Sequence, residues 1–433
     1  MRCILFCAAV LIIAGPVQAA GKPADVKDRT VDGKNLKEWI ADIKKSSDAS
    51  VVVKAIQVVS RYGEAAQEDA GPRLIQLLDH GDLSVRTNAA RAIHAVGLAS
   101  KDVQKGLAAL RRHVRDDQEV MRYDVTQALA KLGQDAQPAI PALTNVLTTD
   151  SSWEVRKGAA HALGMVGKAK DKEPNARAVQ YLIHAMEDKT AQVRLEAEIS
   201  LIRLGAPTAP DLRQRLARAM YRHQTDKDKV VAIWAHVGLM MTRLDKDSNH
   251  VLAIAKALKD KDPNVRYHAV YAVGLIGRSW PETIGPQVPD LIEVLRDRDA
   301  TVSTEVIKSL VNLQTKKVLT GMHLNTIAVM LNDKEAHVRG HAAAALGQLG
   351  ADGARHAKKL VKLLKDKDTD VVISAIVALA SLGKSAIDDS VPALTELKKT
   401  TKDEKVRAAA VTALAILDNT EAKPKNEATE RNP

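Results

Sequence analysis

The stretch DLSVRTNAARAIHAVG at residues 82–97 recurs along the chain in recognisable copies. Each copy has an anchor valine, usually followed by arginine, twelve residues before a glycine, as from Val85 to Gly97. A fixed internal period indicates one supersecondary unit stacked many times. The repeat therefore decides the fold class before any single residue is considered. The clearest copies run over Val85–Gly97, Val155–Gly167, Val193–Gly205, Val265–Gly277 and Val338–Gly350.

Each copy has the pattern of an amphipathic helix. Val85, Ala89, Ile93 and Val96 recur at the spacing of one helical face. Asp82, Asp262 and Asp368, each three positions before an anchor valine, suit the N-cap. The closing glycine suits the left-handed conformation that ends many helices. A second apolar helix precedes each copy, so the unit is a helix–turn–helix. Counting worn copies, we expect about eleven units over residues 34–419.

The pattern Asp-x-x-Val-Arg-x-x-Ala followed by Ala-Leu-x-x-Leu-Gly resembles the HEAT repeat, in the PBS-lyase HEAT-like variety. This resemblance implies an all-α fold of the armadillo type: a right-handed α-α superhelix, or solenoid, of about eleven HEAT-like hairpins. In that family, the repeated arginine commonly joins neighbouring repeats by pairing with a turn aspartate. The resemblance therefore implies a structural ladder made by Arg86, Arg156, Arg194, Arg266, Arg339 and Arg407.

The first residues have the features of an export signal. Met1-Arg2 precedes an apolar run, and Val17-Gln18-Ala19 matches a small-residue cleavage site. We expect a signal peptide over 1–19, a flexible segment over 20–33 and a disordered tail over 420–433. The protein is then periplasmic or secreted; the alternative is a retained N-terminal membrane anchor. Both cysteines, Cys3 and Cys7, lie inside the signal, which excludes thiol chemistry from the mature chain.

The composition limits the partners. The formal net charge is +11, which favours an acidic partner such as an envelope polymer. Aromatic residues make up only 3% of the chain, too few for base-stacking platforms, so we expect no nucleic-acid partner. We also expect a monomer with no membrane span after signal removal.

No motif for catalysis, metal or cofactor binding stands out in the sequence. The dinuclear-iron enzymes that share the HEAT-like fold use His-Glu dipeptides, and this chain has none. Three calcium-loop-like runs lack the glycine and glutamate that such a loop needs. We therefore expect no catalytic residue, no metal and no cofactor. The leading interpretation is a non-catalytic scaffold that binds protein in the cell envelope; the alternatives are acidic-polymer binding and an enzyme of the superfamily.

A cluster of aromatic residues between 221 and 280 is the predicted partner-binding patch. Aromatic side chains anchor interfaces more often than most others. The opposing interpretation is that the worn repeat near residue 233 needs bulkier side chains to fill its core. The predicted contact residues are Trp234, His236, Tyr267, His268, Tyr271 and Trp280.

Overall fold

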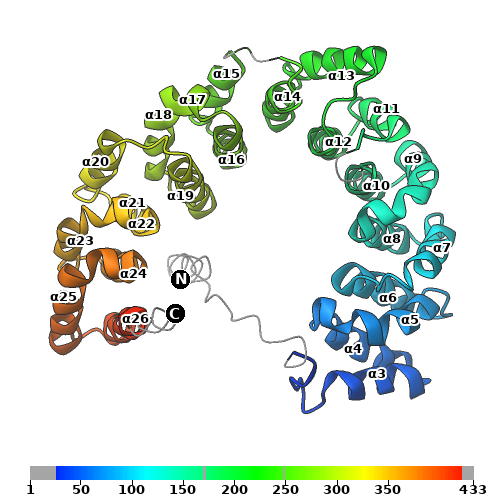
Figure 1. Cartoon of the computed structure of the whole chain (residues 1–433), viewed down its shortest axis with the longest axis horizontal. Helices are drawn as coiled ribbons and strands as arrows, with labels where there is room; N and C mark the ends of the chain where they lie inside the picture. The colour runs from blue at the N-terminus through cyan, green and yellow to red at the C-terminus, as the bar shows by residue number, and fades with distance from the viewer. Residues whose placement is uncertain (1–25, 169–171, 246, 248, 422–433) are drawn as a thin grey trace, which may run out of the picture. The chain divides into compact units, whose positions relative to one another are not determined.

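The computed structural model describes residues 26–168, 172–245, 247 and 249–421 (Figure 1). The chain divides into an N-terminal unit that ends at Asp247 and a C-terminal unit that follows it. Apart from one isolated bridge between Val31 and Lys34, the described residues form helices, turns and loops and no strand. The signal peptide expected over 1–19 lies outside the described residues.

The N-terminal unit is a stack of six helical hairpins (Figure 1). The first helices of successive hairpins pack in one layer and the second helices in another. The first helices are α3 (Leu36–Lys45), α5 (Gln67–Leu77), α7 (Val103–His113), α9 (Ile140–Thr149), α11 (Ala176–Ala185) and α13 (Pro210–His223). The second helices are α4 (Ala49–Ser60), α6 (Leu83–Val96), α8 (Glu119–Leu132), α10 (Trp153–Val166), α12 (Ala191–Leu204) and α14 (Lys229–Met241). Short 3-10 turns, η1 (Gly63–Ala66) and η2 (Gly133–Ala139), precede α5 and α9.

The C-terminal unit adds five hairpins of the same kind, so the described residues hold the eleven expected from the repeat. Their first helices are α15 (Asn249–Ala257), α18 (Val288–Glu293), α20 (Gly321–Met330), α23 (Ala357–Leu363) and α25 (Ile387–Thr400). Their second helices are α16 (Pro263–Ser279), α19 (Ala300–Thr315), α21 (Ala336–Gln348), α24 (Thr369–Leu382) and α26 (Glu404–Glu421). The connecting elements are α17 (Pro281–Ile284), α22 (Gly350–Ala354), η3 (Gly285–Gln287), η4 (Val294–Arg296) and η5 (Gly383–Ala386). The all-α solenoid predicted from the repeat is confirmed.

The repeat residues have the local roles that their spacing predicts. Asp82 caps α6 by accepting hydrogen bonds from the amides of Ser84 at 2.7 Å and Val85 at 3.3 Å. The four apolar positions of this helix, Val85, Ala89, Ile93 and Val96, are each 0% exposed. The core therefore runs along each stack between the two helix layers, and every hairpin contributes side chains to it.

The closing glycine has two different roles. Gly97 has a φ of 81° and ends α6 in the left-handed region, as predicted. Gly277 is different, because α16 continues past it to Ser279. A Cβ at Gly277 would lie 2.2 Å from Cδ2 of Leu313 on α19. The expected helix stop is wrong at this position, where the glycine instead allows close packing between helices.

The edges of the solenoid extend slightly beyond the predicted limits. In the segment that we expected to be flexible, the carbonyl of Val31 accepts a bond from Trp39 Nε1 at 3.0 Å. The carbonyl of Arg29 accepts a bond from the Tyr62 hydroxyl at 2.7 Å. These residues are therefore held against the first hairpin. At the other end, α26 reaches Glu421, and the rest of the predicted tail lies outside the described residues.

One helical stretch of the described chain, Thr369–Thr400, is long and apolar enough to cross a membrane by length and composition alone. It contains α24 and α25, and 61% of its most apolar window is buried inside the protein. A mostly buried core helix of a globular protein can be equally long and apolar. The stretch is therefore weak support for a membrane span.

Candidate functional site

The repeated arginine links neighbouring hairpins, as Arg156 shows. Its Nη1 donates to the carbonyls of Asp150 at 2.9 Å and Ser151 at 3.1 Å in its own turn. Its Nε and Nη2 donate to the carboxylate of Asp188, in the next repeat, at 2.7 and 2.9 Å. Asp188 also accepts the amide of Thr190 at 2.8 Å. One side chain thus joins two turns.

This arrangement also sets the charge state of the pair. The hydrogen bond to Asp188 raises the pKa of Arg156. Burial alone raises the pKa of Asp188, but the bonds from Arg156 and the Thr190 amide outweigh burial and hold that pKa below its ordinary value. Both groups are therefore ionised at neutral pH. The same two-bond pairing joins Arg122–Asp150, Arg194–Asp226, Arg266–Asp297 and Arg339–Asp366.

The six arginines expected in the ladder are not equivalent. Arg156, Arg194, Arg266 and Arg339 form the bidentate link. Arg86 approaches Asp116 only to 3.9 Å. Arg407 bonds to the carbonyl of Thr401 at 2.6 Å and to Glu404, both in its own repeat.

Arg122 also forms this link but was not among the six expected ladder arginines; methionine replaces the anchor valine before it. The ladder position lies six residues after the turn aspartate, as Arg156 follows Asp150. In four repeats the equivalent position holds another residue: Val52, Ala232, Ser303 and Val372.

The residues of the predicted partner-binding patch divide between the two units, with Trp234 and His236 in the N-terminal unit. Trp234 on α14 is a buried hydrophobic residue, only 5% exposed, which removes it from the patch and agrees with the core-filling interpretation for this residue. His236, also on α14, is half-buried, with its Nδ1 3.2 Å from Gln224 Nε2.

The other four predicted contact residues belong to the C-terminal unit. On α16, Tyr267 and His268 pack edge to face with ring centroids 5.3 Å apart. Tyr271 and Trp280 are half-buried. Burial raises the pKa of Tyr267, as expected for a phenol that is partly removed from water. Binding by these four residues and His236 stays a prediction.

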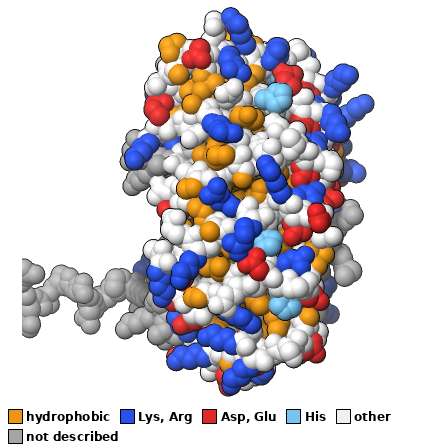
Figure 2. Space-filling model, turned by 90° about the vertical axis from the view of Figure 1, so that its right-hand side faces the viewer, with side chains coloured by type: hydrophobic (Ala, Val, Ile, Leu, Met, Phe, Trp, Pro, Cys, Tyr) orange, Lys and Arg blue, Asp and Glu red, His pale blue; other side chains and the backbone are white. Residues whose placement is uncertain are grey.

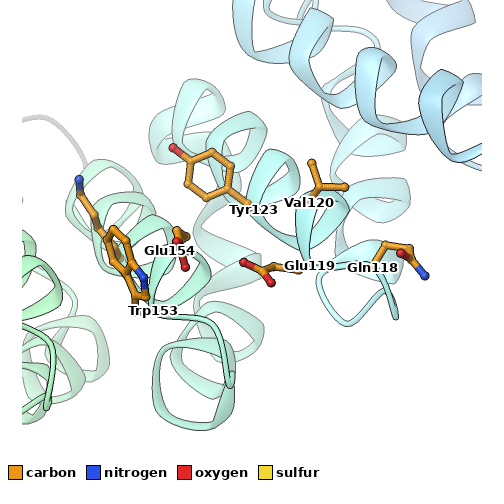
Figure 3. A pocket seen from close by; sticks show the side chains of 7 residues that line it. Gln118, Glu119, Val120, Tyr123, Trp153 and Glu154 are labelled. Atoms are coloured by element: carbon orange, nitrogen blue, oxygen red, sulfur yellow. The ribbon is translucent and has the colours of Figure 1, made fainter.

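A different aromatic surface lies on the N-terminal unit, at the first turns of α8 and α10 (Figure 3). Val120, Tyr123 and Trp153 are 39%, 38% and 38% exposed, respectively. They border a cavity of about 540 Å³, which we name the Tyr123–Trp153 cleft. Its lining residues are Gln118, Glu119, Val120, Tyr123, Trp153, Glu154 and Lys157.

Two carboxylates enter this cleft from the helix starts, where the helix dipole favours acidic side chains. Figure 3 shows Glu119 and Glu154 in the space between the Trp153 ring and Val120. The hydroxyl oxygen of Ser152 lies 2.8 Å from Glu119 Oε1 and 2.9 Å from Glu154 Oε2. A serine hydroxyl has one proton to donate, so it can satisfy only one carboxylate at a time. Neither glutamate, nor Lys157, forms an ion pair within the part of the chain that the structure describes.

The positions of Tyr123 and Trp153 within their repeats could have indicated this cleft from the sequence. Tyr123 lies two residues after its anchor, Met121, and Trp153 lies two residues before its anchor, Val155. Adjacent repeats therefore bring the two rings to one surface. The sequence-based hypothesis followed the density of aromatics between 221 and 280 and passed over this pair.

No metal-binding group of side chains is found among the residues that the structure describes. Across residues 26–421, apart from the undescribed positions, no group of three or more His, Cys, Asp or Glu side chains is placed to hold a metal ion. Two histidine–carboxylate pairs approach to 2.8 Å, the exposed pair Asp79–His113 and the buried pair Glu198–His223. Glu198 is 0% exposed, so the pair that it forms with His223 has no access to a substrate.

Comparison with known proteins agrees with this architecture. The family model described as HEAT repeats matches residues 36–130, 122–202, 140–235, 251–322, 288–380 and 357–425. The chain belongs to the HEAT repeat family. The match does not distinguish the PBS-lyase HEAT-like variety within this family. A search of curated proteins finds no match for this HEAT-repeat chain.

Among solved structures, the HEAT-repeat chain is similar to importin beta, with 15% identity and a TM-score of 0.49 over 89% of this chain and 57% of importin beta. It is similar to Kap121p, with 15% identity and a TM-score of 0.47 over 89% and 45% of the two chains. A designed armadillo repeat protein, solved in complex with the peptide (KR)4, gives 19% identity and a TM-score of 0.41 over 48% and 100%. The chain spans about half the length of the karyopherin structures that it matches.

Proposed function

We propose that this chain is a non-catalytic HEAT-repeat scaffold that binds another protein in the cell envelope, with the Tyr123–Trp153 cleft as its anchor point. The observation that carries the proposal is the exposure of two aromatic rings at one cavity. Tyrosine and tryptophan dominate the binding energy of protein interfaces when a partner covers them. The cavity volume lies within the range of ordinary ligand pockets, about 300–1,000 Å³.

The charge of the cleft favours a partner segment with a basic side chain. Two glutamates and one lysine give the lining a net charge of −1. The carboxylates share a single hydroxyl donor, so an added cation would relieve their repulsion. The flat rings of Tyr123 and Trp153 suit the stem and the charged head of arginine or lysine. We therefore propose that an arginine or lysine of the partner enters between the rings.

The location in the envelope rests on the sequence of residues 1–19. Their charge, apolar run and cleavage pattern support export. The absence of cysteine from the rest of the chain suits an oxidising compartment, since no wrong disulfide can form there.

A crosslinking experiment tests this function. A photoreactive amino acid at position 157, on the rim of the cleft, is irradiated in native cells. We expect one dominant adduct in the envelope fraction, and we expect Tyr123→Ala/Trp153→Ala to remove it. The matched control is Met322→Ala/Val329→Ala, which removes two apolar side chains of α20 that are 69% and 66% exposed. An adduct that survives the first double substitution would contradict the proposal.

A further inference from the structure

A second cleft lies between the first helices of two successive hairpins, α11 and α13. It has a volume of about 530 Å³ and lies on the N-terminal unit. Its floor includes Ile183, which is 7% exposed. The other lining residues are His184, Glu187, Arg215, Arg218, Tyr221 and Arg222, and we name it the Arg215–Arg222 cleft.

The positive charge of this cleft is only partly compensated. Arg222 pairs with Glu187 at 2.7 Å. Arg215 and Arg218 form neither an ion pair nor a hydrogen bond among the described residues. The ladder arginines of the same unit behave differently, because Arg122, Arg156 and Arg194 are each held by a carboxylate through two bonds. Arg215 and Arg218 therefore lack a structural role of that kind.

Helical spacing places the three arginines on one face of α13. Arg215, Arg218 and Arg222 are separated by three and four residues, a spacing that brings side chains together on a helix surface. With a rise of about 1.5 Å per residue, they follow one another along the axis at about 4.5 Å and 6 Å. Like charges at these spacings repel and destabilise the helix. An oxyanion bound between them would remove this repulsion.

Tyr221 forms a fixed wall of the cleft. Its ring is 45% exposed, while its hydroxyl donates to the carboxylate of Asp245. That hydrogen bond is the main reason why the pKa of Tyr221 rises to about 12. The phenol is thus neutral at physiological pH and adds no negative charge beside the arginines.

We propose that the Arg215–Arg222 cleft binds an acidic polymer with phosphate or carboxylate groups that repeat along its length. A guanidinium group binds both kinds of oxyanion through two parallel hydrogen bonds. Successive arginines along the helix suit a ligand with successive charges better than a single ion. A lining with one aromatic ring offers no series of stacking platforms, which argues against single-stranded nucleic acid as the polymer. The site is separate from the Tyr123–Trp153 cleft and does not depend on the function proposed for it.

Fluorescence anisotropy with labelled polymers tests this inference on the full chain. The probes are inorganic polyphosphate and poly-glutamate of matched length, with an oligothymidine as the nucleic-acid probe. We expect Arg215→Gln/Arg218→Gln to weaken binding of the better acidic probe at least tenfold, and the preference between the two identifies the bound group. Both arginines are exposed and unpaired, so these substitutions leave the fold intact, which circular dichroism checks.

The control variant removes the same number of positive charges at a different surface of the protein. Lys358→Gln/Lys362→Gln removes two exposed positive charges from α23, and we expect a change of less than twofold. Equal weakening by both double variants would show attraction by net charge alone and would overturn the inference. Tighter binding of oligothymidine than of either acidic probe, or no binding by the unaltered protein, would also overturn it. The double variant Tyr123→Ala/Trp153→Ala should bind the acidic probes normally, so the two sites can fail independently.

Discussion

Arg156 and Asp188 form a two-bond ion pair between neighbouring repeats, with Nε and Nη2 at 2.7 and 2.9 Å from the carboxylate oxygens. The arginine side chain is 6% exposed and that of the aspartate 12%. Because Arg156 also bonds two carbonyls of its own turn, it fixes one hairpin relative to the next. We propose that this pair and its equivalents stabilise the stack and have no direct part in binding a partner.

Removing the arginine tests that role. Arg156→Gln leaves Asp188 shielded from water without its cation, and breaking a buried pair in this way costs about 3–5 kcal/mol. We expect the first transition in urea unfolding, followed by circular dichroism, to move to lower urea by a corresponding amount. Arg215→Gln is the matched control, since Arg215 is exposed and unpaired; its effect should stay within about 0.5 kcal/mol. Equal midpoints for the two variants would contradict a structural role for the ladder.

The buried pair Glu198–His223 predicts an unusual pH dependence. Burial raises the pKa of Glu198 well above its ordinary value and lowers the pKa of His223, so burial favours the neutral form of both groups. For Glu198, the folded pKa exceeds the unfolded one, so its contribution is full below the unfolded pKa of about 4.3. The contribution is lost as the pH rises toward the folded pKa.

Glu198→Gln keeps a donor for His223 Nδ1 and removes the titration. We expect the variant to gain stability relative to the unaltered chain as the pH increases from 5 to 8, measured as the difference between urea midpoints. His223→Gln serves as a comparison that leaves Glu198 in place and therefore retains its slope. A Glu198→Gln variant that becomes relatively less stable toward pH 8 would refute this assignment.

Two glycines of α21 are predicted to respond in opposite directions to alanine. A Cβ at Gly347 would lie 2.6 Å from the Ala378 Cα on α24, so the two backbones must separate. Overpacking of this kind costs about 1–3 kcal/mol. A Cβ at Gly340 meets nothing closer than Ser374 Oγ at 3.4 Å. There the helix gains up to about 1 kcal/mol from replacement of glycine. Thermal unfolding of Gly347→Ala and Gly340→Ala should therefore shift in opposite senses; a shared direction would argue against the close approach of α21 and α24.

The repeat pattern was enough to predict the hairpins, their caps and their core positions, because each depends on neighbours at a fixed spacing. Asp82 and Val85 illustrate this: one caps the helix and the other is buried, as expected. The pattern failed where a role depended on another repeat. Gly277, for example, lies against Leu313 of the next repeat. Trp234 was misjudged for another reason, because a local density of aromatic residues does not distinguish a buried ring from an exposed one. The density of aromatic residues between 221 and 280 also led the site prediction away from the Tyr123–Trp153 cleft. Tyr123 and Trp153 are 30 residues apart in the sequence but line the same cleft.

The carboxylates of the Tyr123–Trp153 cleft make the binding proposal sensitive to salt. If a basic side chain of the partner enters the cleft, Glu119→Gln/Glu154→Gln should weaken binding to the crosslinked partner at low ionic strength. The difference from the unaltered chain should shrink at high salt, because mobile ions screen exposed charges within about 10 Å at 0.1 M. Asp388→Asn/Asp389→Asn, at the start of α25, where Asp388 is exposed and Asp389 half-buried, removes the same charge elsewhere and should have little effect. Unchanged or tighter binding by the glutamate variant would contradict the proposal that a basic side chain of the partner enters the cleft. It would not affect the proposal that Tyr123 and Trp153 anchor the partner.

The affinity of the Tyr123–Trp153 cleft for its partner is the most direct test of the central claim. The partner identified by crosslinking is purified, and isothermal titration calorimetry measures its Kd for three proteins. These are the unaltered chain, Tyr123→Ala/Trp153→Ala and the control Met322→Ala/Val329→Ala. Loss of aromatic anchors at an interface costs about 2 kcal/mol or more, roughly a thirtyfold change in Kd. The account predicts at least this weakening for the first variant and less than a twofold change for the control. Equal affinity for all three proteins, with their helical content preserved, would contradict it.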